Sequence, residues 1–107
     1  MYDIIIVGAG PAGLTAAVYA RRANKSVLLL DKAAFGGQIT YSPKIENYPG
    51  FESISGSELA DKMVEQVLGQ GAEIDMDTVK ALEKTENGFK VIPNNTGIKL
   101  YFKEIIL

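Results

Sequence analysis

The sequence predicts an α/β fold, in which a Rossmann-like parallel sheet (a βαβ unit) is followed by an antiparallel three-stranded β-meander. Two apolar runs separated by a glycine-rich turn and a helical segment indicate the βαβ unit. Short strand-like runs that alternate with turn sequences in the last third of the chain indicate the meander. The chain has 107 residues, of which 47% are hydrophobic, so it can form one core of ordinary size and one domain.

The first three elements follow from the spacing of apolar residues. Residues 4–7 are β-branched without polar alternation, which is typical of a strand buried on both faces. Residues 11–24 favour a helix, because apolar residues recur at helical spacing and Arg21 and Arg22 lie near its end, where the dipole is negative. We expect these basic side chains to serve mainly solvation. Residues 27–30 form a second apolar run, which predicts a parallel pair joined by a right-handed crossover.

Residues 32–56 show neither helical nor strand periodicity and contain Pro43, Pro49 and several glycines. A loop of this length is uncommon in a compact domain unless it binds something or is disordered. Too many of its side chains are apolar or aromatic for disorder: Phe35, Ile39, Tyr41, Ile45, Tyr48 and Phe51. We therefore expect the loop to be ordered around a ligand or a partner.

A second amphipathic helix is predicted after this loop. Ser55 and Glu58 have the spacing of a capping box, and the apolar stripe that follows ends at Gly69 and Gly71. Residues 72–76 are expected to form a short strand.

The rest of the chain is predicted to be the meander. Its strands are expected at residues 79–84, 89–92 and 98–102, with turns at residues 86–88 and 94–97. Glu104 is expected to interrupt the pattern before residues 105–107, which begin like another buried strand.

Composition excludes several classes of function. Cysteine and histidine are absent from these residues, which excludes disulfides, thiol nucleophiles, Cys/His metal sites and triads that need an imidazole. A formal charge of −2 argues against nucleic-acid binding. The N-terminus lacks a basic signal region and residues 4–7 are too few to span a bilayer, so we expect a cytoplasmic protein without membrane contact. No metal site or catalytic side chain is predicted, and any chemistry must come from a cofactor.

The turn after the first strand carries a phosphate-binding pattern. Residues Gly8, Ala9, Gly10, Pro11, Ala12 and Gly13 read G-x-G-x-x-G. In this pattern the first glycine makes a tight turn, the second lets backbone approach a pyrophosphate, and the third lets the helix pack on the strand. The phosphates would lie at the helix N-terminus, where N–H groups and the dipole favour negative charge. The alternative is a plain strand-to-helix turn without a ligand.

Asp31 completes this pattern, because it lies at the end of the second strand, 18 residues after Gly13. Its carboxylate would accept hydrogen bonds from the ribose hydroxyls of an adenosine and would repel a 2′-phosphate, which argues against NADP in this site. The alternative is a polar residue that merely ends the strand.

Three segments together resemble the low-molecular-weight, bacterial-type thioredoxin reductases, which are FAD-dependent pyridine nucleotide-disulfide oxidoreductases. The segments are residues 2–13 (YDIIIVGAGPAG), 36–40 (GGQIT) and 45–51 (IENYPGF). The resemblance implies an FAD/NAD(P)-binding fold and an enzyme that passes electrons from NADPH through FAD to a disulfide of a thioredoxin-like protein.

The resemblance also implies roles for individual residues. Gly8 to Gly13 would hold the FAD pyrophosphate, and Asp31 with Lys32 would meet the adenosine ribose, although family members more often carry Glu at the position of Asp31. Contacts along the ribityl and flavin part would come from Gly36, Gly37, Gln38 and Asn47, and an adenine contact through backbone from Val79. Taken singly, the loop residues could equally be turn formers or exposed polar groups.

Family members are substantially longer than this chain, with an inserted NADPH domain that carries a C-x-x-C and a second FAD segment. We therefore interpret residues 1–107 as the N-terminal segment of an FAD-binding domain, inactive as a reductase on its own and prone to form a homo-oligomer through unpaired strand edges. Two alternatives stay open: a ferredoxin or flavodoxin NADP reductase-like flavoprotein, and a non-catalytic nucleotide-binding module or fragment.

Overall fold

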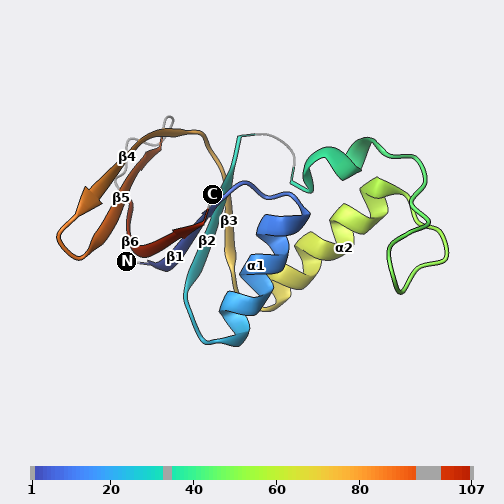
Figure 1. Ribbon diagram of the computed structural model, residues 1–107, viewed down its shortest axis with the longest axis horizontal. Coiled ribbons are helices and arrows are strands. Elements are labelled where there is room, and N and C mark those ends of the chain that lie inside the picture. Colours follow the sequence, from blue (N-terminus) through green and yellow to red (C-terminus); the bar gives the residue numbers. More distant parts are fainter. Residues whose placement is uncertain (1, 33–34, 94–99, 107) are drawn as a thin grey trace.

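A computed structural model describes residues 2–32, 35–93 and 100–106 and confirms the predicted α/β fold (Figure 1). The elements in chain order are β1 (Tyr2–Val7), α1 (Pro11–Arg22), β2 (Val27–Asp31), the 3-10 helix η1 (Gly37–Tyr41), α2 (Gly56–Gly69), β3 (Glu73–Met76), β4 (Val79–Thr85), β5 (Gly88–Pro93) and β6 (Leu100–Ile106). The strands form one six-stranded sheet in the order β3-β2-β1-β6-β5-β4.

The parallel half of the sheet is centred on β1. It pairs in parallel with β2 on one side and with β6 on the other, and β2 pairs in parallel with β3. Helices α1 and α2 cover one face of these strands, where Ile6 and Leu29 of the sheet share a core with Leu14 and Val67 of the helices (Figure 1). The helical spacing and the β-branched run therefore direct apolar side chains to this core, as predicted.

The meander covers the opposite face of the same strands. Ile5 and Leu28 belong to a second core with Val91 of β5 and Phe102 of β6, and the ring of Phe102 stacks on Phe89 with centroids 5.8 Å apart. Strands β1 and β2 are thus buried on both faces, which explains why their sequences lack polar alternation.

Two expectations about the last residues were wrong. The third meander strand and the separate strand expected at residues 105–107 are one strand, β6, which continues through Glu104. This strand pairs antiparallel with β5 at its start and parallel with β1 further along, where Ile4 pairs with Glu104. An exposed charged side chain is compatible with a strand, because successive side chains point to opposite faces. The turn expected at residues 94–97 lies outside the described residues, as do residues 98–99 and 107.

Ser55 is confirmed as the N-cap of α2. Its hydroxyl oxygen accepts a hydrogen bond from the backbone N–H of Glu58 at 3.1 Å, and α2 begins at the next residue. Arg21 was expected to serve mainly solvation, but the structure gives it a bridging role. Its Nε donates to the carbonyl oxygen of Gln70 at 2.8 Å and its guanidinium also donates to that of Lys25 at 2.9 Å, so it joins the C-terminal ends of the two helices.

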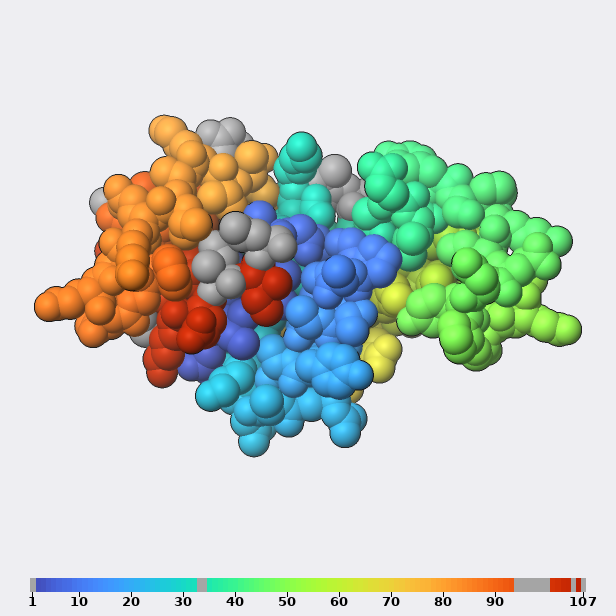
Figure 2. Space-filling model, viewed as in Figure 1, coloured from blue at the N-terminus to red at the C-terminus, as the bar shows by residue number. Residues whose placement is uncertain are grey.

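The molecule is elongated, with principal extents of 48 × 28 × 18 Å. Figure 2 shows why: the β4–β5 hairpin projects at one end and the green segment between η1 and α2 projects at the other. An isolated antiparallel bridge between Ile45 and Ile54 closes the base of that segment. Within the described part of the chain, no helix is long and apolar enough to cross a membrane.

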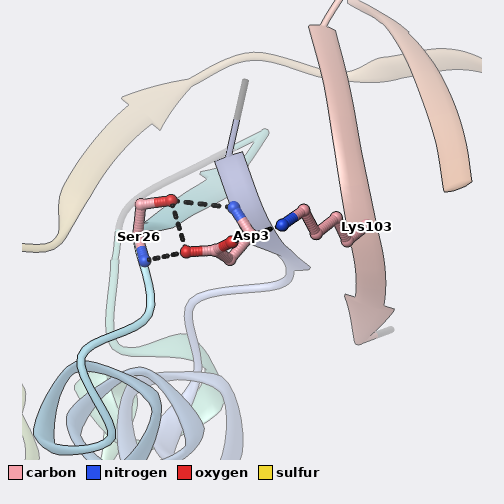
Figure 3. A network of polar contacts seen from close by, with 3 residues as sticks. All are labelled: Asp3, Ser26 and Lys103. Atoms are coloured by element: carbon pink, nitrogen blue, oxygen red, sulfur yellow. Dashed lines mark hydrogen bonds and ion pairs between the residues drawn. The ribbon is translucent and has the colours of Figure 1, made fainter. Parts of the chain in front are cut away.

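Three polar side chains fasten the start of β1 to its surroundings (Figure 3). The Asp3 carboxylate accepts hydrogen bonds from the backbone N–H of Ser26 at 2.9 Å and from its hydroxyl at 3.1 Å, while that hydroxyl oxygen accepts from Asp3 N–H at 2.8 Å. Lys103 of β6 lies 3.5 Å from the second carboxylate oxygen. The hydrogen bond from the Ser26 backbone is the main cause that lowers the pKa of Asp3 below its usual 3.8.

We expect the free energy of unfolding to fall on acidification partly through Asp3. Because the folded protein binds the Asp3 proton less tightly than the unfolded chain, this contribution is present above pH 3.8 and is lost as the pH falls through the lower folded pKa. Asp3→Asn should therefore unfold with a smaller acid dependence than the parent, measured by urea titration between pH 7 and pH 2. Asp61→Asn, on the exposed face of α2, is the matched control. An equal loss of stability in the parent and Asp3→Asn would contradict this role.

Candidate functional site

The β1–α1 turn lies at the carboxyl end of the central strand, and two of its glycines are required by the turn itself. Gly8 has a φ of 109°, a conformation that side-chain-bearing residues rarely adopt. A Cβ added to Gly13 would lie 2.0 Å from the carbonyl oxygen of Gly8, so the first turn of α1 packs directly against the end of β1. These two positions agree with the roles expected for the first and third glycines of the pattern.

Gly10 differs, because neither backbone conformation nor packing requires a glycine there. Its φ is −80°, and an added Cβ would meet only the Cα of Gly37, at an ordinary contact distance of 3.9 Å. The space beside it is a cavity of about 300 Å³ at the N-terminus of α1, lined by Ile6, Val7, Gly8, Gly10, Pro11, Ala12, Gly13 and Ile106. No side chain caps this helix and its first turn carries no acidic residue, so its N–H groups and dipole are suited to an anion such as a pyrophosphate.

The peptide groups of Ala9 join the turn to two other segments. The backbone N–H of Ala9 donates to Oδ2 of Asp31 at 2.7 Å, and its carbonyl oxygen accepts from the N–H of Gly36 at 2.6 Å. Ala9 is completely buried, and both of its backbone polar groups are therefore satisfied. The structure thus places Asp31 against the phosphate-binding pattern, a contact that the sequence pattern alone did not reveal.

A second cavity of about 380 Å³ lies beside the first, and Gly8 and Val7 line both. Its other lining residues are Leu30, Asp31, Lys32, Asp77, Thr78 and Val79. It brings together three residues that the resemblance assigned to the adenosine: Asp31, Lys32 and Val79. Asp77 was not predicted from the sequence, because a lone aspartate between two strands looks like any turn residue.

The loop residues are divided between the site and the surface. Gly37 lies against the turn, since a Cβ there would lie 3.0 Å from the Cα of Gly10. Gln38 and Asn47 are exposed, and neither lines either cavity. Tyr48 borders a different hollow of about 470 Å³ between α1 and α2. The structure therefore brings Gly36 and Gly37 to the phosphate-binding pattern, and leaves Gln38 and Asn47 away from it.

The geometry of the two cavities fits the adenosine diphosphate part of a dinucleotide. The uncapped helix N-terminus and the open space at Gly10 can accept a pyrophosphate, and the adjoining cavity offers a carboxylate for ribose hydroxyls. Among the described residues, no group of three or more metal-ligating side chains is arranged to hold a metal ion.

Comparisons with known proteins point to one family. A family model described as pyridine nucleotide-disulphide oxidoreductase matches residues 2–107. The chain is 52% identical over 80 residues to the thioredoxin reductase of Bacillus subtilis, covering 75% of this chain and 25% of that protein. It is 46% identical over 107 residues to the thioredoxin reductase of Listeria innocua, covering 100% of this chain and 33% of that protein.

Among solved structures, the thioredoxin reductase of Lactococcus lactis matches with a TM-score of 0.90 and 40% identity, covering 98% of this chain and 34% of that one. The chain thus spans between a quarter and about a third of the length of these relatives. The resemblance to thioredoxin reductases and the Rossmann-like fold expected from the sequence are both confirmed. The chain belongs to the pyridine nucleotide-disulphide oxidoreductase family.

Proposed function

We propose that these residues bind the adenosine diphosphate part of FAD in a flavoprotein that passes electrons from NADPH through the flavin to the disulfide of a thioredoxin-like protein. The proposal rests mainly on the surroundings of Gly10. The backbone there could carry a side chain, yet the residue is a glycine, and this leaves open the space in front of the uncapped N-terminus of α1. The similarity to thioredoxin reductases supports the disulfide as the electron acceptor.

In this proposal the chain's own residues bind and orient the cofactor. The N–H groups of the first turn of α1 receive the pyrophosphate, and the dipole of the helix favours its negative charge. The Asp31 carboxylate, held by Ala9 N–H, also accepts from ribose hydroxyls, since a carboxylate can accept several hydrogen bonds. Val79, at the start of β4, contacts adenine through its backbone. The bound flavin supplies the hydride and electron chemistry.

The segment from Gly36 to α2 forms the flavin side of the site in this proposal. It is attached to the phosphate-binding pattern by the Gly36–Ala9 hydrogen bond and to the start of α2 by the hydrogen bond from Gly56 N–H to the Ser42 carbonyl, at 2.8 Å. Gln38 and Asn47 are proposed to contact the flavin once it is bound, which requires this exposed segment to close over the cofactor. A cytoplasmic homo-oligomer is part of the same proposal, since the edge strands β3 and β4 offer backbone groups for pairing with a second copy.

Gly10→Val tests the phosphate assignment. The valine side chain would fill the space of the pyrophosphate, so we expect at least about tenfold weaker binding of FAD and of ADP-ribose with an unfolding midpoint close to that of the parent. Calorimetric titration measures the affinity. Gly69→Val is the matched control, because an added Cβ there meets nothing within 4 Å and lies at the far end of α2, away from the cavity. Unchanged binding by Gly10→Val would show that the phosphates lie elsewhere.

The loop should become ordered on binding FAD. We expect amides of residues 35–56 to exchange hydrogen more slowly with FAD than without it, because bound flavin would supply contacts to this exposed segment. Exchange followed by mass spectrometry measures the change. Residues 83–90, at the far end of the β4–β5 hairpin from Val79, are the internal control that should not respond. Equal protection with and without FAD would count against the flavin-side assignment.

The 107-residue polypeptide should have no disulfide reductase turnover. It contains no cysteine to relay electrons from the flavin to a protein disulfide. An assay of the purified polypeptide with NADPH, FAD and a disulfide acceptor should give the rate of free FAD. A rate clearly above that background would overturn the interpretation of this chain as one part of the catalytic unit.

A further inference from the structure

Asp77 is the only charged residue that is buried among the residues whose burial is described, with 5% of its surface exposed. It lies between β3 and β4 and is held on both sides. Its N–H donates to the carbonyl oxygen of Asp31 at 2.9 Å, and its Oδ1 accepts from the N–H of Thr78 at 2.7 Å. Asp77 also lines the cavity proposed for the adenosine, so it lies where its charge can act on a bound ligand.

Asp77 determines the sign of the formal charge of the cavity lining. Among the described residues that line the cavity, Asp31 and Lys32 are the charged ones besides Asp77. With Asp31 and Lys32 alone, the cavity would contain one carboxylate and one ammonium, whose charges balance. Asp77 adds the second carboxylate and makes the formal charge of the described lining residues negative.

The sign of this charge distinguishes two kinds of adenosine. An adenosine with a free 2′-hydroxyl brings only neutral donors and acceptors to the cavity, and carboxylates accept hydrogen bonds from its hydroxyl and amino groups. An adenosine with a 2′-phosphate brings additional negative charge, which a lysine would attract and two carboxylates repel.

We infer that Asp77 is a specificity-determining residue. Its carboxylate, together with that of Asp31, gives the cavity more negative than positive charge despite Lys32, and so restricts the cavity to adenosines without a 2′-phosphate. This inference rests on the proposed FAD site. Its consequence there is that NADPH, the proposed electron donor, is kept out of the place where the adenosine of FAD must bind. Discrimination thus depends on the β3–β4 corner as well as on the acid at the end of β2.

The test compares ADP-ribose with 2′-phospho-ADP-ribose, two probes that differ only in the phosphate. The quantity measured is the ratio of their dissociation constants for the 107-residue chain at low ionic strength, where surface charges are least screened. In Asp77→Asn the preference for ADP-ribose should fall by at least about threefold, the size expected of one unit charge acting through a largely aqueous path. Asn retains an oxygen that can accept from Thr78 N–H, so the corner should keep its structure.

Three further variants complete the design. Asp77→Ser also removes the charge and keeps an acceptor for Thr78, so it should lower the preference even if Asp77→Asn folds poorly. Asp31→Asn is the positive control and should lower the preference as well. Asp75→Asn is the matched control, because Asp75 is exposed on β3 two residues away and does not line the cavity.

The outcomes distinguish a failure of the inference about Asp77 from a failure of the proposed FAD site. A lower preference in both Asp77 variants, with Asp75→Asn like the parent, supports the inference. If both probes weaken equally in the Asp77 variants, Asp77 only supports the corner and the inference is overturned. Equal affinity of the parent for the two probes overturns it too. If the parent binds neither ADP-ribose nor FAD, the proposed function fails, and the inference fails with it.

Discussion

The backbone of a single residue, Ala9, holds the parts of the site in register. It is buried between the end of β1 and the start of α1, where water cannot satisfy its N–H and C=O groups. Asp31 from the end of β2 and Gly36 from the following loop supply the two partners. Two hydrogen bonds to one residue therefore fix the positions of β2 and of the loop relative to the phosphate-binding turn. Loss of either bond would leave a buried polar group without its protein partner.

Close backbone contacts continue this arrangement beyond Ala9. A Cβ at Gly56 would lie 1.5 Å from the carbonyl oxygen of Ile39, so the first turn of α2 is in direct contact with η1. The N–H of Gly56 also donates to the carbonyl of Ser42. The start of α2 is thus connected to the phosphate-binding turn through η1 and Gly36. A displacement of the loop at Gly36 would therefore displace the start of α2 as well, because closely packed backbone has little room to adjust.

Local patterns in the sequence predicted most of the fold. Helix α2 starts where Ser55 and Glu58 indicated, and the β-branched run of β1 is buried on both faces because layers pack on each side of it. Contacts between distant segments were not predictable in this way. The continuity of β6 depends on pairing with β1 about a hundred residues earlier, and the role of Arg21 depends on the carbonyl of Gln70. Such partners leave no periodic signal in the sequence.

The candidate site shows the same division. The glycine pattern and its acid located the turn and Asp31, because their spacing reflects the geometry of one βαβ unit. The burial of Asp77 and its place in the cavity follow from the way the β3–β4 corner meets the end of β2, which only the three-dimensional structure shows. Gln38 and Asn47 were assigned from family resemblance alone, and their exposed positions make them the residues whose roles depend most on a bound cofactor.

The double pairing of β6 affects how the chain can fold during synthesis. Strand β1 leaves the ribosome before β6, its neighbour in the sheet, which lies about a hundred residues later in the sequence, where Tyr2 pairs with Phe102. Closing so long a loop has an entropic cost that arises before any favourable contact has formed, so pairings of high sequence separation form slowly. The central strand therefore stays open on one side until β6 has been made. During that interval its exposed edge is a site where a nascent chain would need protection from pairing with another chain.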